Sequence, residues 1–162
     1  MALQQSSNFQ VFIPFLGKEQ YQVQSIELPG LSVTPLEAFS QSSKRALIGG
    51  DSINLDPVTI EFVVDEKLEL YKKVMSYFHS ICNVNDGFIN PEFDFTCGIE
   101  ITDNMGISLI CMQLYGCRIE SINSLQYSAN QEDNDMILSV TLKFDDYEFI
   151  DKSKFKELYL IK

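Results

Sequence analysis

Apolar and polar residues alternate along much of this chain, which is the period of strands that bury one face. Within 20–28 the apolar positions change parity, which predicts a bulge near Ser25. Pro14 lacks the amide donor that a central strand needs, so it predicts a sheet edge or a bulge at that point. The alternation predicts strands over 8–16, 20–28, 58–65, 93–103, 107–115, 117–128 and 136–144.

One segment switches to helical spacing directly after a strand. Asp65 is well placed to cap a helix, with Glu66 and Glu69 in the first turn, where the helix dipole favours negative charge. Apolar residues then recur at steps of three and four, as on a helix with one buried face. They are Leu70, Val74, Phe78 and Ile81, flanked by Tyr71, Met75 and Cys82. We therefore predict a helix over 66–82.

The order of these elements indicates a mainly β fold with one helix. Strands do not alternate with helices, which argues against a doubly wound parallel sheet. We predict an antiparallel β-sandwich or partly closed barrel, with the helix covering one end or flank. Residues 1–150 are expected to form a single domain, and the tail, 151–162, to be a short helix or an extended arm.

Residues 31–55 form a long connection that contains five Ser and two Gly, with one Thr and one Gln. A connection of this length inside a compact domain is usually functional or ordered by a partner, although a mobile surface loop is the alternative. Leu47 and Ile48 stand beside two glycines and favour a docking loop, with Lys44 and Arg45 close by. These four residues are our candidates for contact with a neighbouring molecule.

The predicted strand at 107–115 is apolar on both faces. Leu109 and Cys111 belong to one face, and Ile110, Met112 and Leu114 belong to the other. Such a strand is either covered on both sides or lies in a subunit interface. Ile110, Met112 and Leu114 are therefore candidate inter-subunit residues, and Gly116 permits a bend directly after them.

Composition indicates a folded, acidic protein. The 162 residues are 45% hydrophobic and 12% aromatic, which is enough to bury the core of one domain. A net charge of −11 argues against nucleic-acid binding, because binding needs Lys and Arg to displace counterions. The same charge suits a protein that lets DNA pass without holding it, or simply confers solubility. No segment has the length of a membrane span, and the N-terminus lacks the pattern of a signal peptide, which predicts synthesis in a cytosol.

Candidate chemistry is sparse. The cysteines form no C-x-x-C pair, and Cys97 and Cys111 fall on apolar strand positions typical of free core thiols. His79 lies near the C-terminal end of the predicted helix, where a cation is favoured without any catalytic role. The pairs Asp133/Asp135 and Asp145/Asp146 lack the spacing of a calcium loop. We expect no catalytic, cofactor-binding or metal-binding residues, and hence no enzyme.

Two stretches of the chain resemble one protein family. The run 53–65, followed by Tyr71, Met75 and Phe78, is similar to the central strand and helix of contractile phage tail tube proteins. The similarity is greatest to the baseplate–tail tube junction proteins of T4-like phages. Their closing pattern resembles 114–119, 124–127, the Asp133-Asn134 turn and 137–144, and the strand end before their long loop resembles 25–29. The resemblance covers roughly residues 8–148. It does not decide between a protein of the tube proper and a protein of the junction ring, because this chain lacks the long N-terminal region of the junction proteins.

The resemblance implies a structural role. Members of the family have a β-sandwich or barrel core, assemble as six copies in a ring, and stack their rings into a hollow tube. Strands of neighbouring subunits join into an inner barrel, and loops bridge to the next ring. The implied partners are further copies of this chain and other tube, baseplate and sheath proteins, without a cofactor or membrane. DNA would pass through without specific binding, in a virion tail assembled in the host cytoplasm.

Three other functions fit parts of the pattern. The tube protein of a related secretion or contractile injection machine shares the fold that the resemblance implies. A monomeric barrel that binds a small ligand or a partner would pack 107–115 within one chain. An enzyme would need His79 and a cysteine brought together in space, and no local signature supports that arrangement.

Overall fold

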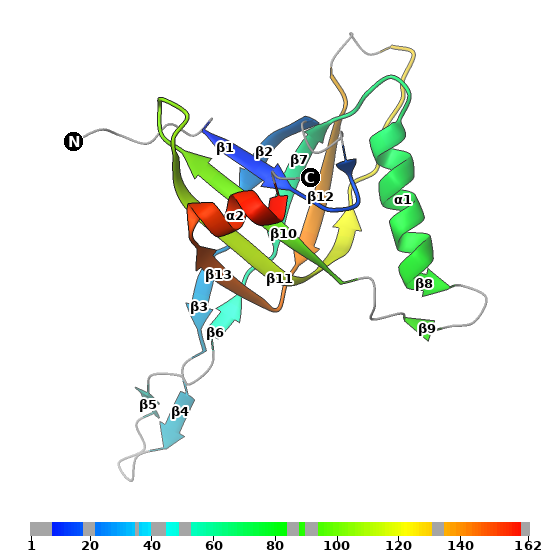
Figure 1. Cartoon of the computed structure of the whole chain (residues 1–162). Coiled ribbons are helices and arrows are strands. Elements are labelled where there is room, and N and C mark those ends of the chain that lie inside the picture. Colours follow the sequence, from blue (N-terminus) through cyan, green and yellow to red (C-terminus); the bar gives the residue numbers. More distant parts are fainter. Residues whose placement is uncertain are drawn as a thin grey trace.

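The computed structural model describes residues 8–17, 22–34, 36–39, 45–48, 53–83, 88–89, 94–130 and 135–159, with the backbone alone for 36–39, 45–48, 82–83 and 88–89. The main sheet is antiparallel and has seven strands (Figure 1). They are β1 (Phe9–Phe12), β2 (Val23–Glu27), β7 (Val58–Val63), β10 (Phe95–Thr102), β11 (Ser108–Ile122), β12 (Ile137–Lys143) and β13 (Asp146–Ile150). The predicted mainly antiparallel β fold is confirmed.

The long strand β11 organises the sheet, whose order is β1-β10-β11-β12-β7-β2. Residues 111–115 of β11 pair with β13, and residues 118–122 pair with β12, so the predicted strands 107–115 and 117–128 are largely one strand. Between the two parts lies Gly116, with a φ of +63°, and a Cβ there would lie against Asp145 Oδ2 and 2.9 Å from Asp145 Cγ. Gly116 therefore permits the bend that the sequence predicts, because a side chain is strained at this φ and would collide with Asp145.

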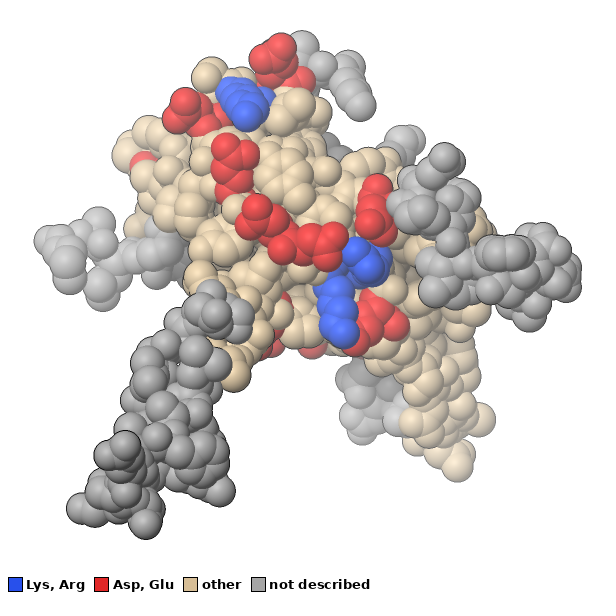
Figure 2. Space-filling model, turned by 90° about the horizontal axis from the view of Figure 1, so that it is seen from below, with Lys and Arg blue, Asp and Glu red and all other residues tan. Residues whose placement is uncertain are grey.

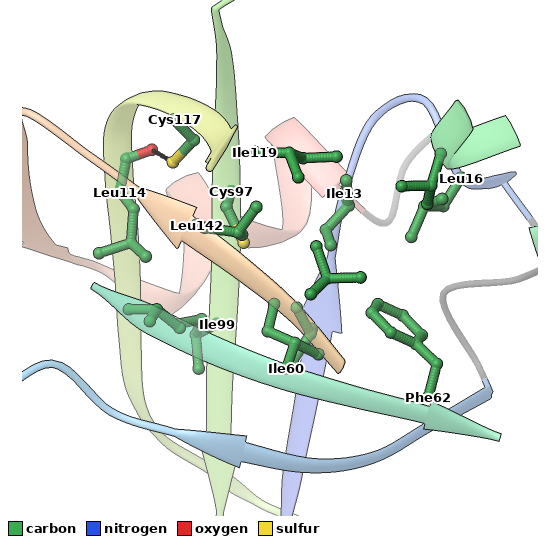
Figure 3. Packing of buried hydrophobic residues seen from close by; sticks show 14 of the residues in the cluster. Ile13, Leu16, Ile60, Phe62, Cys97, Ile99, Leu114, Cys117, Ile119 and Leu142 are labelled. Atoms are coloured by element: carbon green, nitrogen blue, oxygen red, sulfur yellow. Dashed lines mark hydrogen bonds between the residues drawn. The ribbon is translucent and has the colours of Figure 1, made fainter. Parts of the chain in front are cut away.

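The main core lies between the two parts of the curved sheet and under the first helix (Figure 3). It includes Ile13, Leu16, Ile60, Phe62, Cys97, Ile99, Leu114, Cys117, Ile119 and Leu142. A second, smaller cluster joins Phe12 and Cys111 to Phe155 of α2 (Lys152–Tyr159), with Ile150 and Tyr159 packed around them. The middle of β11 is thus covered on both faces within one chain, by the main core and by α2. This second helix is the first of the two forms that we predicted for the tail, 151–162, a short helix rather than an extended arm.

The first helix, α1 (Glu69–Ile81), begins three residues later than predicted and ends one residue earlier. Leu68 has a φ of +55°, outside the right-handed helical region, so helical backbone cannot start before Glu69. Asp65 still caps the helix, since its Oδ1 accepts a hydrogen bond from the Glu69 amide at 3.1 Å. Leu70, Val74 and Tyr77 are buried, and Tyr77 stacks on Phe15 at 4.7 Å between ring centroids.

Both local irregularities predicted in the first two strands are present. β1 lies at one end of the sheet order and stops before Pro14, as an edge strand should. β2 pairs with β7 through a register shift between Val23 and Ser25, which is the predicted bulge.

The remaining strands are short. Four of them occupy the connection 31–55, namely β3 (Leu31–Val33), β4 (Leu36–Phe39), β5 (Arg45–Ile48) and β6 (Ile53–Leu55). After α1, β8 (Cys82–Asn83) and β9 (Phe88–Ile89) form a two-residue pair.

Candidate assembly surfaces

The described parts of the connection 31–55 are four short strands, β3 to β6, which project from the main sheet and which we call the arm (Figure 1). β3 pairs with β6 at its base, and β4 pairs with β5 farther out. The base is closed by the Asp56 amide, which donates to the Gly30 carbonyl at 3.1 Å. The β3–β6 and β4–β5 pairs give these short segments backbone partners within the arm itself.

The base of the arm has one apolar face. Leu31 pairs with Leu55 and Val33 pairs with Ile53, while Ser32 and Asn54 lie opposite each other on the other face. Leu31, Val33 and Ile53 are each more than half exposed, and we call these three residues the arm face. Our sequence analysis missed them, because the alternation in Leu31-Ser32-Val33 and in Ile53-Asn54-Leu55 extends over only three residues in each strand.

The predicted docking residues belong to the outer part of the arm. Arg45, Leu47 and Ile48 lie in β5, in register with Phe39, Glu37 and Leu36 of β4, respectively. Lys44 lies outside the described residues. The structure thus places three of the four on a ribbon that projects from the body, and their contact with a neighbouring molecule stays a prediction.

The candidate inter-subunit residues of β11 are in different surroundings. Leu114 is fully buried and Met112 is nearly so, both in the main core, because the chain's own sheet covers that face. Ile110 is 45% exposed and lies nearer the start of the strand. Of the three side chains, only that of Ile110 offers substantial surface to a second molecule.

The main sheet has open backbone edges. Among the described residues, β1 and β2 end the strand order, and β13 pairs with β11 alone. Each of the three strands thus has one side on which no described strand accepts or donates its hydrogen bonds. Unpaired edges of this kind can add a strand from another molecule.

Carboxylates form a band across the underside of the molecule (Figure 2). Two cations of the described sheet are held by such groups: Arg118 pairs with Asp145 at 3.0 Å and more loosely with Asp94, and Lys143 pairs with Glu120 at 2.9 Å. These pairs are exposed and contribute little to stability.

Three cysteines in the described part of the chain are buried free thiols. Burial raises the pKa of the Cys97 thiol well above its usual value and that of Cys117 to about 12, so both thiols are protonated at neutral pH. Cys117 donates to the Leu114 carbonyl at 3.3 Å (Figure 3). Cys97 and Cys111 are buried free thiols, as predicted. In the part of the chain that is described, no cluster of His, Cys, Asp and Glu could hold a metal ion, and none of its helices could cross a membrane.

The fold is shared with solved structures, whereas no protein-family model and no curated protein matches the chain. One similar structure is the tube-terminating cap of the anti-feeding prophage, with a TM-score of 0.67, 16% identity, and coverage of 93% of this chain and 92% of that chain. Another comes from the sheath-tube complex of the PVC extracellular contractile injection system, with a TM-score of 0.63, 17% identity, and 91% of each chain covered. A third belongs to the anti-feeding prophage baseplate, described as 6-fold symmetrised, with a TM-score of 0.57, 11% identity, and coverage of 93% and 97%.

The chain therefore has the fold of the tube and cap proteins of contractile injection systems. The tail-tube fold that the sequence resemblance implied is confirmed. These neighbours are structural components of injection machines rather than enzymes.

Proposed function

We propose that this protein is a structural component of a contractile tail or injection machine, in which six copies form a ring that belongs to the tube or terminates it. The observation that carries the proposal is a tail-tube fold with open sheet edges and a projecting arm. A ring closed through these edges would leave no strand free to aggregate. The arm would then contact the next ring of the stack.

The position along the tail follows less directly from the fold. The similar structures come from a cap, a sheath-tube complex and a baseplate, so one fold serves at both ends and along the length of such machines. We propose a ring of the tube itself or a ring at the baseplate that initiates the tube, in a phage tail or in a related secretion or injection machine. Its partners would be copies of itself and the other tube, baseplate and sheath proteins, in a particle assembled in the host cytoplasm.

The acidic surface suits a conduit for DNA. The chain carries −11 net charge, and a carboxylate band crosses one face of the molecule. Like charge keeps a polyanion from adhering to the wall of a channel. In the phage-tail form of the proposal, DNA passes through the ring without specific contacts.

The test is native mass by light scattering on the purified protein, together with negative-stain images of the same sample. Sixfold rings or hollow tubes are expected. Should the protein stay monomeric, purified baseplates or tail ends would be added as templates, because subunits of such tubes can wait for one. A chain that remains monomeric even with these templates would overturn the proposal and favour a monomeric binding barrel.

A further inference from the structure

The turn between β10 and β11 is unusually well fixed for a surface hairpin. Asp103 Oδ1 accepts hydrogen bonds from the amides of Met105 and Ile107, each at 2.8 Å. The Asp103 amide donates to the Ile107 carbonyl at 2.8 Å, and the Gly106 amide donates to the Asp103 carbonyl at 3.0 Å. Asn8 of the neighbouring strand end donates from its side chain to Asn104 at 2.8 Å. The backbone of this turn is therefore held before any partner arrives.

This fixed turn presents large apolar side chains to solvent. Met105, Ile107, Leu109 and Ile110 are all exposed, from 45% for Ile110 to 86% for Met105, and we call these four residues the hairpin face. The pairing of Thr102 with Ser108 and of Ile101 with Ile110 leaves Leu109 as an extra residue in β11, so a bulge changes the direction of the strand there. Scattered exposed apolar residues are ordinary, but four within six positions of a rigid turn indicate a contact surface.

The arm face lies at the other end of the molecule. In Figure 1 the β10–β11 turn is at the upper end of the barrel, and the arm leaves its lower end. Two different apolar surfaces at opposite ends fit a head-to-tail contact, which repeats along an axis and builds a stack. Two copies related by a twofold axis would instead need each surface to match itself.

Charge does not select the orientation, because residues 31–55 carry as many carboxylates as cations: Glu37 and Asp51 against Lys44 and Arg45. The pairing of the two surfaces therefore rests on their exposed apolar side chains and on their places at opposite ends of the molecule.

We propose that the hairpin face is the acceptor for the arm face of a second copy of this chain. This inference rests on the proposed function and names the receiving surface for the arm. A contact of a few side chains on each partner is far smaller than the roughly 20–30 residues a side of a stable pairwise interface. Single pairs are therefore weak, and stacking becomes strong only when several contacts form together around a closed ring. The fixed turn lowers the entropic cost of each contact.

Cysteine cross-linking between two different single variants tests the pairing directly. Met105→Cys and Ile53→Cys place thiols at exposed positions, and both would carry Cys82→Ser, since the other three native cysteines are buried. A short bis-maleimide should link the two variants when they are mixed, and each variant alone should give little product. Linkage of the Met105→Cys variant to itself would show a symmetric hairpin contact instead, and no linkage in the mixture would likewise overturn the proposal.

A charge variant then separates this inference from the proposed function. Leu109→Glu should raise the critical concentration for stacking by about tenfold or more and leave ring mass unchanged, because a carboxylate cannot be desolvated against the arm face. Tyr127→Glu is the matched control, since Tyr127 is also a large exposed side chain, 69% against 57% for Leu109, but belongs to neither face. Thermal unfolding confirms that each variant is folded.

The combination of outcomes is decisive. If Ile53→Glu blocks stacking and Leu109→Glu does not, the arm docks elsewhere and only the acceptor is wrong. If neither variant changes stacking, the base of the arm has no docking role and this inference is overturned, and docking by the outer part of the arm is decided by Leu47→Asp combined with Ile48→Asp. A wild-type chain that shows no self-association at its highest soluble concentration, with or without a template, overturns both.

Discussion

Replacing Gly116 by Ala tests the claim that a bend in β11 holds the two parts of the sheet together. Gly116 has a φ of +63°, where a side chain costs about 1–2 kcal/mol. The new Cβ would also lie 2.9 Å from Asp145 Cγ, so the Asp145 side chain must move and lose its pair with Arg118. That exposed pair contributes no more than about 1 kcal/mol.

The two effects together give a loss of about 1–3 kcal/mol in the free energy of unfolding. For a chain of this size, about 2–4 °C of melting temperature is lost per kcal/mol, so we expect a decrease of about 2–12 °C. Urea titration monitored by circular dichroism gives the free energy, and a scanning melt gives the temperature.

Gly106→Ala is the matched control. Gly106 has a φ of +79°, but nothing lies within 4 Å of the position that its Cβ would take, so this variant loses only the backbone term. Adding Asp145→Ala to Gly116→Ala removes the collision and should recover about 1 kcal/mol in a double-mutant cycle. The reasoning is refuted if Gly116→Ala is no more destabilising than Gly106→Ala, or if the cycle shows no coupling.

Three further changes have defined outcomes. Phe155→Ala should cost about 3–5 kcal/mol in denaturant unfolding, because Phe155 is the fully buried residue of α2. Leu158→Ala, at a position that is 42% exposed, should cost much less. Equal costs for the two variants would contradict the packing of α2. Asp65→Ala should cost about 1 kcal/mol by removing the acceptor for the first amide of α1, and no change would show that the cap is unimportant. Leu47→Asp combined with Ile48→Asp should block stacking of rings in negative-stain images and leave the melting curve unchanged, and normal tubes from this variant would rule out the docking role of β5.

Periodicity in the sequence was sufficient for the sheet strands because each one buries a single face. Val58, Ile60 and Phe62 alternate with half-buried neighbours along β7, so the burial pattern repeats the pattern of the sequence. The start of α1 could not be found in this way. Leu68 takes a positive φ in a turn that Asp65 stabilises, and ordinary helix-forming residues at 66 and 67 give no sign of it.

The assembly surfaces were predicted only in part, for a different reason. The apolar residues of β11 have the same sequence signature whether a helix or another subunit covers them, and Phe155, which covers Cys111, is more than 40 positions away. The arm was predicted to be a loop because its strands are only three or four residues long, too short for a clear period. The hairpin face escaped notice because Met105 and Ile107 read as the end of a turn and the start of a buried strand.

In the proposed assembly, the open sheet edges would select the partner strand and the apolar faces would supply the attraction between rings. The edges are guarded against indiscriminate pairing: β1 stops before Pro14, β2 contains a bulge, and β13 carries Asp146 and Glu148 on its exposed side. An edge of this kind accepts only a strand whose register and charge fit it. In a closed ring, that strand would be an edge strand of the neighbouring copy. The arm face and the hairpin face carry no such guards, so they can attract any copy that approaches in the right orientation. Since each of these apolar contacts is small, attraction becomes effective only after the selective edges have gathered several copies into a ring, and for this reason we expect ring formation to precede stacking.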